Sequence, residues 1–341
     1  MNLHIQKRDK KKGDEVKKYI ETLTKPPGSL GRLEELAVSL AEMTGQSFPI
    51  ITPPGIIIFA ADHGIVAEGV SAFPQEVTAQ MVYNFLNEGA AINVFSKQID
   101  AIFKIIDIGV NKQIEHQKLI KRKIRPGTRN FLQEDAMTKE EVNHALQIGF
   151  AEAKKMIRNG IRCIIPGEMG IGNTTAASAI VAVLSGKSVN RLVGRGTGIS
   201  TEKLQHKESI IKKALKRRQP DPTDPYDILA KVGGFEIAGM AGAILAGAAH
   251  RIPILLDGFI CTAAALIATK INKNVGDYII IGHQSAEPGH DIAVHLLGKK
   301  PILDLEMRLG EGTGAAVAFP ILLSAIKMLE METFSSAHIS K

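Results

Sequence analysis

The sequence predicts an α/β protein built on a doubly wound, mainly parallel β-sheet. Short apolar runs recur from residue 56 to residue 281, and most of them precede a glycine-bearing turn and an Ala-rich stretch of helical length. Continuous apolar runs are typical of strands that are covered on both faces, as in a parallel sheet. With 341 residues, of which 45% are hydrophobic, the chain is long enough to bury a large core.

Apolar residues at helical spacing dominate the first fifty residues, after a turn-forming stretch at 25–29. The residues that recur at this spacing are Leu30, Leu33, Leu36, Ala37, Leu40 and Ala41. A Pro-Pro-Gly sequence at 53–55 then interrupts the pattern. We therefore expect a helical segment at 1–50, an α/β catalytic core at 51–320 and a C-terminal helical segment at 321–341.

Buried strands are predicted at residues 56–61, 101–106, 162–166, 252–256 and 278–281. In doubly wound sheets, ligands bind beyond the carboxyl ends of the strands. The turns that follow these runs combine glycine with Asp, Glu, His, Ser and Asn, as in GEMGIGNTT and GHQSAEPGHD. Such side chains at that edge of the sheet indicate an enzyme.

The basic charge balance does not by itself indicate a nucleic-acid partner. Lys and Arg number 42 against 35 Asp and Glu, and they cluster at 7–12, 121–125 and 212–218. The chain has no Trp and only 5% aromatic residues, so it lacks the side chains on which bases stack. Solvated helix faces explain the clusters better than nucleic-acid binding does.

Nothing in the sequence predicts secretion or a membrane partner. The N-terminus is basic and lacks the apolar segment of a secretory signal. The apolar stretch at 237–249 is too short to span a bilayer, and the one at 252–268 contains Asp257. Two cysteines, Cys163 and Cys261, fit a reducing compartment and are expected to be buried packing residues. We expect a cytoplasmic protein.

A glycine-rich loop at 167–174 lies between a predicted strand and a predicted helix. Its spacing nearly matches the phosphate loop G-x-x-x-x-G-K-[ST], but Asn173 stands in place of the lysine. Backbone N–H groups at a helix N-terminus bind oxyanions, and Thr174 adds a hydroxyl. Without the lysine, a single terminal phosphate is the better match. The alternative is a tight turn with Asn173 or Thr174 as the helix N-cap.

Two carboxylates lie between glycines, Glu168 in this loop and Glu311 in RLGEGTG. A ligand can approach such a carboxylate closely, and burial can turn it into a general base with a raised pKa. The alternative is an exposed turn acid or a helix N-cap partner. Composition alone leaves these two interpretations equal.

Weaker patterns remain. A G-x-G-x-G sequence at 194–198 fits either a glycine-lined wall or a plain loop. A metal-dependent hydrolase is the other class considered, on the residues Asp62, His63, His283, Glu287, His290 and Asp291. No paired-His metal spacing occurs among them, so we expect hydrogen-bonded loop histidines and no metal.

Seven motifs follow one another along the chain: KPPGSLGRL, ADHGIVAEGVSAFPQEVTAQM, GEMGIGNTTAASA, GRGTG, LDGF, SAEPGH and RLGEGTGAA. Together, over residues 25–323, they resemble the nicotinate-nucleotide–dimethylbenzimidazole phosphoribosyltransferase family. The resemblance implies a Rossmann-like sheet, a small helical domain contributed by the chain ends, and a homodimer.

The reaction that the resemblance implies moves the phosphoribosyl group of nicotinate mononucleotide to 5,6-dimethylbenzimidazole, in the assembly of the lower ligand of cobamides. The products are α-ribazole 5′-phosphate and nicotinate. Because nicotinate leaves as a neutral ring nitrogen, no metal or other cofactor is expected. The alternatives are transfer to another base such as adenine or a phenol, a metal-dependent hydrolase, and a nucleotide-binding regulator without chemistry.

The resemblance also implies roles for individual residues. Glu311 matches the general base, and Glu168 matches a second carboxylate that holds the base or the ribose. The other residues implied in substrate binding are Gly172, Asn173 and Thr174 at the phosphate, Lys207 near the donor, Gln80, Met169 and Leu309 around the aromatic base, and Gly170 and Ser285. Ser285 ends the turn at 282–285, Gly-His-Gln-Ser, where the family favours Ser-His-Arg-Ser.

Overall fold

A single seven-stranded sheet organises the computed structural model, which describes residues 3–196, 198 and 200–340. All pairings are parallel, in the order β3-β2-β1-β4-β5-β6-β7. The strands are β1 (Pro54–Ala61), β2 (Ile102–Gly109), β3 (Leu119–Lys121), β4 (Cys163–Met169), β5 (Ile254–Leu256), β6 (Ile279–Gln284) and β7 (Pro301–Asp304). The predicted α/β class is confirmed.

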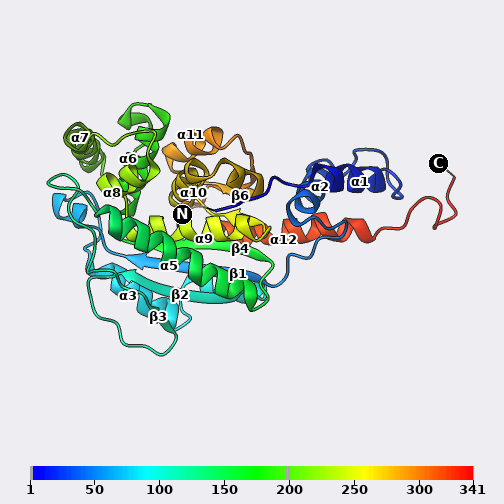
Figure 1. Cartoon of the computed structure of the whole chain (residues 1–341), viewed down its shortest axis with the longest axis horizontal. Helices are drawn as coiled ribbons and strands as arrows, with labels where there is room; N and C mark the ends of the chain where they lie inside the picture. The colour runs from blue at the N-terminus through cyan, green and yellow to red at the C-terminus, as the bar shows by residue number, and fades with distance from the viewer. Residues whose placement is uncertain (1–2, 197, 199, 341) are drawn as a thin grey trace.

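Helices cover both faces of this sheet (Figure 1). One face contacts α3 (Glu76–Leu86), α4 (Ala91–Gln98) and α12 (Thr313–Lys327), and the other contacts α9 (Phe235–Ala249) and α10 (Phe259–Ile271). The remaining α-helices of the described chain are α1 (Lys10–Ile20), α2 (Arg32–Thr44), α5 (Lys139–Arg158), α6 (Asn173–Ser185), α7 (Thr201–Arg218), α8 (Pro225–Val232) and α11 (Pro288–Leu296).

The five predicted strands correspond to β1, β2, β4, β5 and β6, while the edge strands β3 and β7 were not predicted. Each of the central strands β1, β4 and β5 is buried along its whole length, which explains its continuous apolar sequence. The strands β3 and β7 have three and four residues and are partly exposed. A short edge strand needs no continuous apolar run, so it leaves little trace in a sequence.

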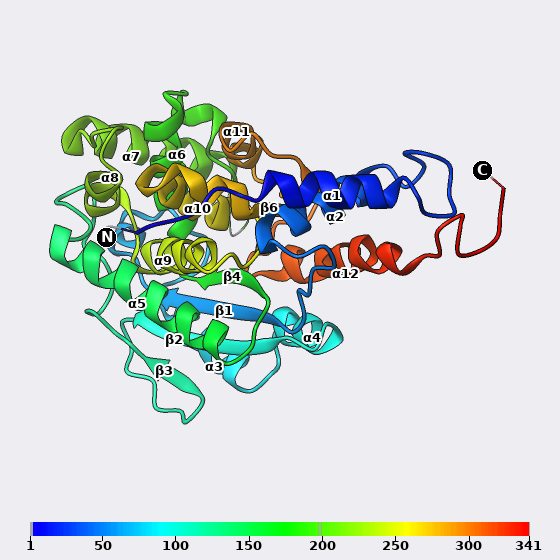
Figure 2. The ribbon, with the colours of Figure 1, turned by 45° about the vertical axis from the view of Figure 1, so that its right-hand side comes forward.

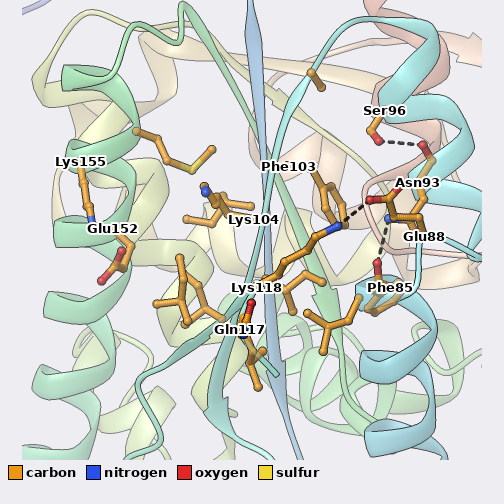
Figure 3. A pocket seen from close by; sticks show the side chains of 18 of the residues that line it. Phe85, Glu88, Asn93, Ser96, Phe103, Lys104, Gln117, Lys118, Glu152 and Lys155 are labelled. Carbon is orange, nitrogen blue, oxygen red and sulfur yellow. Dashed lines mark hydrogen bonds and ion pairs between the residues drawn. The ribbon is translucent and has the colours of Figure 1, made fainter. Parts of the chain in front are cut away.

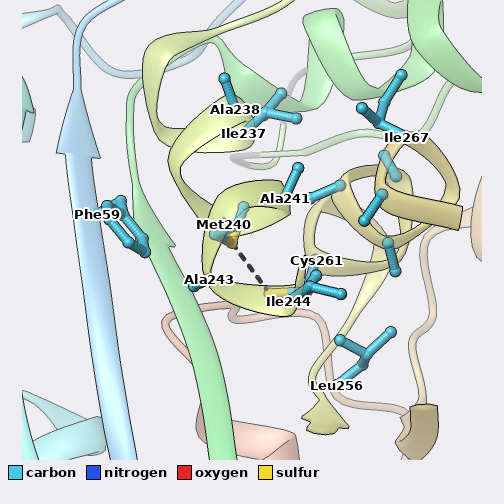
Figure 4. Packing of buried hydrophobic residues seen from close by; sticks show 14 of the residues in the cluster. Phe59, Ile237, Ala238, Met240, Ala241, Ala243, Ile244, Leu256, Cys261 and Ile267 are labelled. Atoms are coloured by element: carbon cyan, nitrogen blue, oxygen red, sulfur yellow. Dashed lines mark hydrogen bonds between the residues drawn. The ribbon is translucent and has the colours of Figure 1, made fainter. Parts of the chain in front are cut away.

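Helix α9 is buried almost entirely because it lies between the sheet and α5. The two helices touch through small residues: a Cβ atom on Gly149 of α5 would lie 1.8 Å from the carbonyl oxygen of Gly239 on α9. On its other side, α9 packs against α10, where the Cys261 thiol lies 3.5 Å from the sulfur of Met240 (Figure 4). Both cysteines are buried, and burial raises the pKa of the Cys163 thiol to about 12.

Replacing Gly149 with Ala should destabilise the protein. The gain in helix propensity is about 1 kcal/mol, whereas overpacking against a backbone oxygen costs about 1–3 kcal/mol and more when neither helix can move. We expect a lower urea midpoint of unfolding. Gly276→Ala is the matched control, because its Cβ atom would make an ordinary contact at 3.8 Å. Equal urea midpoints for the two variants would show that α5 and α9 can move apart at little cost in free energy.

The two chain ends form a second, smaller core, called here the chain-end cluster. Its buried residues are Val16, Ile20, Leu23, Ala37, Ala41, Met328 and Leu329. A β-bridge between Leu23 and Thr333 ties the ends together. Figure 2 shows α1 and α2 beside the end of α12, far from α6 and α7. The domain boundary predicted at residue 320 falls inside α12, which runs from the sheet into the cluster.

One helical stretch among the described residues, Thr313–Glu330, has the length and apolar composition of a membrane span. Of this stretch, 56% is buried within the protein. The stretch contains α12, which packs on β6 and α2. A mostly buried core helix can have the same length and apolar composition as a membrane span.

Candidate active site

A cavity of about 620 Å³ lies where the carboxyl ends of β4, β5 and β6 meet. The turns after these strands form its wall, together with the segment before α12 and part of α3. The lining residues are Val70, Ser71, Phe73, Val77, Met81, Glu168, Met169, Gly170, Ile171, Gly172, Asn173, Thr174, Gly196, Asp257, Gly258, Phe259, Ile260, Cys261, His283, Ser285, Glu287, Arg308, Leu309, Gly310 and Glu311.

Most of the residues singled out in the sequence meet in this cavity. Those that line it are Glu168, Met169, Gly170, Gly172, Asn173, Thr174, Ser285, Leu309 and Glu311. Lys207 reaches the wall from α7, since its Nζ donates to Thr174 Oγ1 at 2.8 Å. Gly196, from the glycine-rich stretch at 194–198, also lines the cavity, whereas Thr197 lies outside the described residues.

The structure places Gln80, which the resemblance puts around the aromatic base, outside this cavity. Gln80 is exposed on α3 and does not line the cavity. Helix α3 presents Val77 and Met81 to the cavity instead. These two residues are four positions apart and share one helix face, while Gln80 lies about 100° further round from Met81.

The N-terminus of α6 opens into the cavity without a side-chain cap. Its N-cap residue is Gly172, and Asn173 is already the first helical residue, so the predicted alternative of Asn173 or Thr174 as N-cap is wrong. Asn173 instead donates its side-chain N–H to Glu168 Oε2. The backbone N–H groups of Asn173 and Thr175 donate to the carbonyls of Gly170 and Gly172, but the positive end of the helix, which no side chain caps, still attracts anions. The turn is therefore suited to a phosphate group.

Glu168 and Glu311 lie beside each other, each with 6% of its surface exposed. The Glu311 backbone N–H donates to Glu168 Oε1 at 3.3 Å. Burial raises the pKa of Glu168 to about 8 and that of Glu311 to about 7, with neighbouring carboxylates adding to both shifts. The alternative of exposed turn acids is thus wrong. Near neutral pH, Glu168 therefore mostly keeps its proton, while Glu311 titrates in that range and can accept a proton in its ionised form.

Lys207 places a buried positive charge at the wall of the cavity, beside Thr174. It is 1% exposed, and burial lowers its pKa to about 8, while the charge of Glu287 opposes that shift. Glu287 in turn accepts a hydrogen bond from the Gly196 N–H at 3.0 Å. At neutral pH Lys207 is mostly protonated, so a cation and the N-terminus of α6 lie on the same side of the cavity.

The histidines near the cavity are held by hydrogen bonds, as predicted. His63 lies 2.5 Å from Glu236, and His283 lies 3.1 Å from Asp257. Burial lowers the pKa of His290 to about 4, so its neutral ring accepts from the Ser285 N–H at 2.9 Å. Within the described residues, no group of three or more His, Cys, Asp and Glu side chains is arranged to hold a metal ion.

A larger cavity of about 710 Å³ lies at the edge of the sheet beside β2 and β3, between α3, α4 and α5 (Figure 3). Its acidic residues are already paired: Glu88 contacts Lys97 and Lys118 at 2.9 and 2.8 Å, and Glu152 contacts Arg122 at 2.8 Å. None of the residues implicated by the sequence lines it. The smaller cavity at the carboxyl ends is the candidate active site.

Asp257 is the main residue of this site to which the sequence analysis gave no role. It follows β5 directly and is 1% exposed. The sequence did contain a signal for a role of Asp257 in the site, because an Asp immediately after a buried strand lies at the ligand-binding edge of a parallel sheet.

A parallel doubly wound sheet, an uncapped helix N-terminus and two buried carboxyls define an enzyme for a phosphorylated substrate. Comparison with known families agrees: a profile described as phosphoribosyltransferase matches residues 5–339. The chain belongs to this phosphoribosyltransferase family.

Relatives over nearly the whole length carry a more particular name. A protein of Halalkalibacterium halodurans, 49% identical over 98% of this chain and 94% of its own length, is named nicotinate-nucleotide–dimethylbenzimidazole phosphoribosyltransferase. A protein of Chloroflexus aggregans with the same name is 48% identical over 99% and 96%. The crystal structure of CobT from Thermus thermophilus is 45% identical, covers 97% of this chain and 99% of its own, and superposes with a TM-score of 0.94.

Proposed function

We propose that this chain transfers the phosphoribosyl group of nicotinate mononucleotide to 5,6-dimethylbenzimidazole, with α-ribazole 5′-phosphate and nicotinate as products. The reaction supplies the lower-ligand nucleotide of cobamides. The names of the relatives support this substrate pair. The observation that carries it is the buried pair Glu168 and Glu311 beside the uncapped N-terminus of α6.

Glu311 acts as the general base in this proposal. One benzimidazole nitrogen attacks C1′ of the ribose, and the proton on the other nitrogen passes to the Glu311 carboxylate. The bond between C1′ and the pyridinium nitrogen breaks, and its electron pair stays with nicotinate. Attack from the face opposite the leaving group inverts C1′, which accounts for the α linkage. A positioned base contributes a factor of about 10²–10⁴ to the rate.

The remaining polar groups bind and orient the donor. Gly172 and Asn173 at the start of α6, the Thr174 hydroxyl and the Lys207 ammonium hold the 5′-phosphate, because they combine the positive end of a helix, a hydroxyl donor and a positive charge. Glu168, protonated at neutral pH, holds the base or the ribose. Other contacts come from Met169 and Leu309 against the aromatic ring and from Gly170 and Ser285.

We also propose a cytoplasmic homodimer that works without membrane or nucleic-acid partners. The family resemblance is the main support. In addition, Phe73 and Leu309 line the cavity yet are 51% and 56% exposed. Exposed apolar side chains of this size are the kind that subunit interfaces bury. Light scattering of the purified protein measures the oligomeric state directly, and a monomer at micromolar concentration would overturn this part.

The decisive experiment mixes the purified protein with nicotinate mononucleotide and 5,6-dimethylbenzimidazole in the presence of EDTA. We expect nicotinate and α-ribazole 5′-phosphate in equal amounts, because each transfer releases one molecule of each. EDTA should not lower the rate, because the ring nitrogen of nicotinate leaves without charge and needs no metal to stabilise it. Chromatography separates both products. Turnover with adenine or a phenol, and none with 5,6-dimethylbenzimidazole, would show that the chain uses a different acceptor base. Loss of activity to EDTA would contradict the proposal and favour a metal-dependent hydrolase.

A further inference from the structure

Asp257 lies at the N-terminus of α12, where its carboxylate accepts backbone hydrogen bonds on both oxygens. Oδ2 accepts from the Gly312 N–H at 3.0 Å, and Oδ1 accepts from those of Gly314 and Ala315 at 2.7 and 3.3 Å. A negative charge is favourable at the positive end of a helix. Asp257 therefore ties the end of β5 to the segment that carries Glu311.

His283 orients this carboxylate from the neighbouring strand. Its Nε2 lies 3.1 Å from Asp257 Oδ1, and the ring is 2% exposed at the end of β6. The ring fits because position 314 has no side chain: a Cβ atom there would lie 2.0 Å from His283 Cδ2. Asp257, His283 and the start of α12 are thus packed as one unit.

The backbone of Glu311 has a conformation that needs such support. Its φ is +64°, between Gly310 at +91° and Gly312 at +86°. Residues other than glycine rarely adopt this left-handed conformation, and it persists where surrounding contacts determine it. Here the Glu311 N–H is bound to Glu168 and the next N–H, of Gly312, is bound to Asp257.

We propose that Asp257, oriented by His283, is a positioning residue that holds the Glu311 carboxyl in place for proton transfer from the acceptor base. The inference rests on the proposed function, in which Glu311 is the general base. It predicts that the Asp257 carboxylate, and not only a side chain of the same shape, is needed for the chemical step.

Charge supports the same assignment. The charged and titratable residues that line the cavity with Glu311 are Glu168 at the end of β4, Asp257 after β5, Cys261 on α10, His283 at the end of β6, Glu287 before α11 and Arg308 on its own segment. The facing side of α3 contributes the uncharged Val77 and Met81. Burial is the larger cause of the raised pKa of Glu311, and the negative charge of Asp257 is the second. Removing that charge lowers the pKa, so Glu311 becomes ionised at lower pH and is a weaker base.

The test is Asp257→Asn, measured with nicotinate mononucleotide and 5,6-dimethylbenzimidazole as a function of pH. In the wild type, kcat/KM should rise through about pH 7 as Glu311 loses its proton. In the variant, we expect this rise to shift by about one unit to lower pH. We also expect kcat to fall by about 10²-fold through misplacement of the base, with KM for the nucleotide unchanged. Asp291→Asn, at an exposed position on α11, is the matched control and should keep the wild-type profile.

If circular dichroism shows that Asp257→Asn does not fold, two variants of His283 test the inference instead. His283→Gln keeps an N–H donor for Asp257 and should retain more of kcat than His283→Ala, which has none. Equal kcat values and equal pH profiles for the His283 pair, or a wild-type pH profile for folded Asp257→Asn, would overturn the inference. A wild-type enzyme without turnover would instead overturn the proposed function.

Discussion

Replacing Glu311 with Gln should lower kcat by about 10²–10⁴-fold, the usual contribution of a general base. Glutamine has nearly the same shape and fits the same buried turn, but its amide cannot accept the proton that the benzimidazole loses. Because Glu311 lies apart from the Lys207 side of the proposed phosphate site, KM for nicotinate mononucleotide should change less than twofold. Steady-state kinetics with both substrates varied measures the two parameters separately.

The pH dependence gives this prediction a second readout. Burial raises the pKa of Glu311 to about 7, so wild-type kcat/KM should rise through that pH as the carboxyl loses its proton. The Gln variant has no proton to lose there, and its residual activity should lack this rise. Glu306→Gln, at an exposed position shortly before in the chain, serves as the control. Full activity in Glu311→Gln would move the role of base to another residue, with Glu168 the first to examine.

Replacing Lys207 with Met should raise KM for nicotinate mononucleotide by about 10–100-fold, since a hydrogen bond to a charged group contributes about 1.5–3 kcal/mol. The proposed contact is between the buried ammonium and the 5′-phosphate, which does not change during the reaction. We therefore expect a smaller effect on kcat than on KM. Methionine keeps the length and apolar stem of the side chain, so the packing of α7 should be preserved.

The melting temperature of Lys207→Met shows whether a change in KM comes from lost binding or from damaged folding. Burying a charge costs free energy in the absence of ligand, and the attraction between Lys207 and Glu287 offsets part of that cost, so the melting temperature of Lys207→Met should change little. Lys203→Met, at an exposed position one turn earlier on α7, should leave KM unchanged. Burial lowers the pKa of Lys207 to about 8, so the wild-type affinity for the nucleotide should weaken as pH rises above that value. An unchanged KM in Lys207→Met would exclude the phosphate contact.

The centre of the fold could be predicted because burial on both faces leaves a strong pattern. In β1, the run Ile56, Ile57, Ile58 and Phe59 is fully enclosed, so every position is apolar. The strand β7 starts at a proline and stays partly exposed, and nothing in its four residues separates it from a loop. A domain boundary near α12 is likewise hard to locate, because the apolar pattern continues without a break from α12, which packs in the main core, to Met328 and Leu329 of the chain-end cluster.

The position of the site could also be predicted, since the carboxyl edge of a parallel sheet collects the turns that hold Glu168 and Glu311. The contacts of Asp257 could not. Its partners lie 55 to 58 residues further along the chain and are backbone N–H groups, which every sequence contains. The orientation of Gln80 depends on the rotation of α3 about its axis, and the motif that contains it carries no information on that rotation.

The chain-end cluster has a consequence for the order in which the protein assembles during synthesis. Leu23 pairs with Thr333. At a synthesis rate of about 5–20 residues per second, Thr333 is made about 15–60 s after Leu23, so the N-terminal helices cannot form this contact before then. Helix α12 starts next to Glu311, and Met328 and Leu329, which directly follow it, belong to the same cluster. The central sheet can form on the nascent chain before then. The catalytic turn can bind Glu168 and Asp257 only after its own residues have emerged, which places its assembly near the end of synthesis.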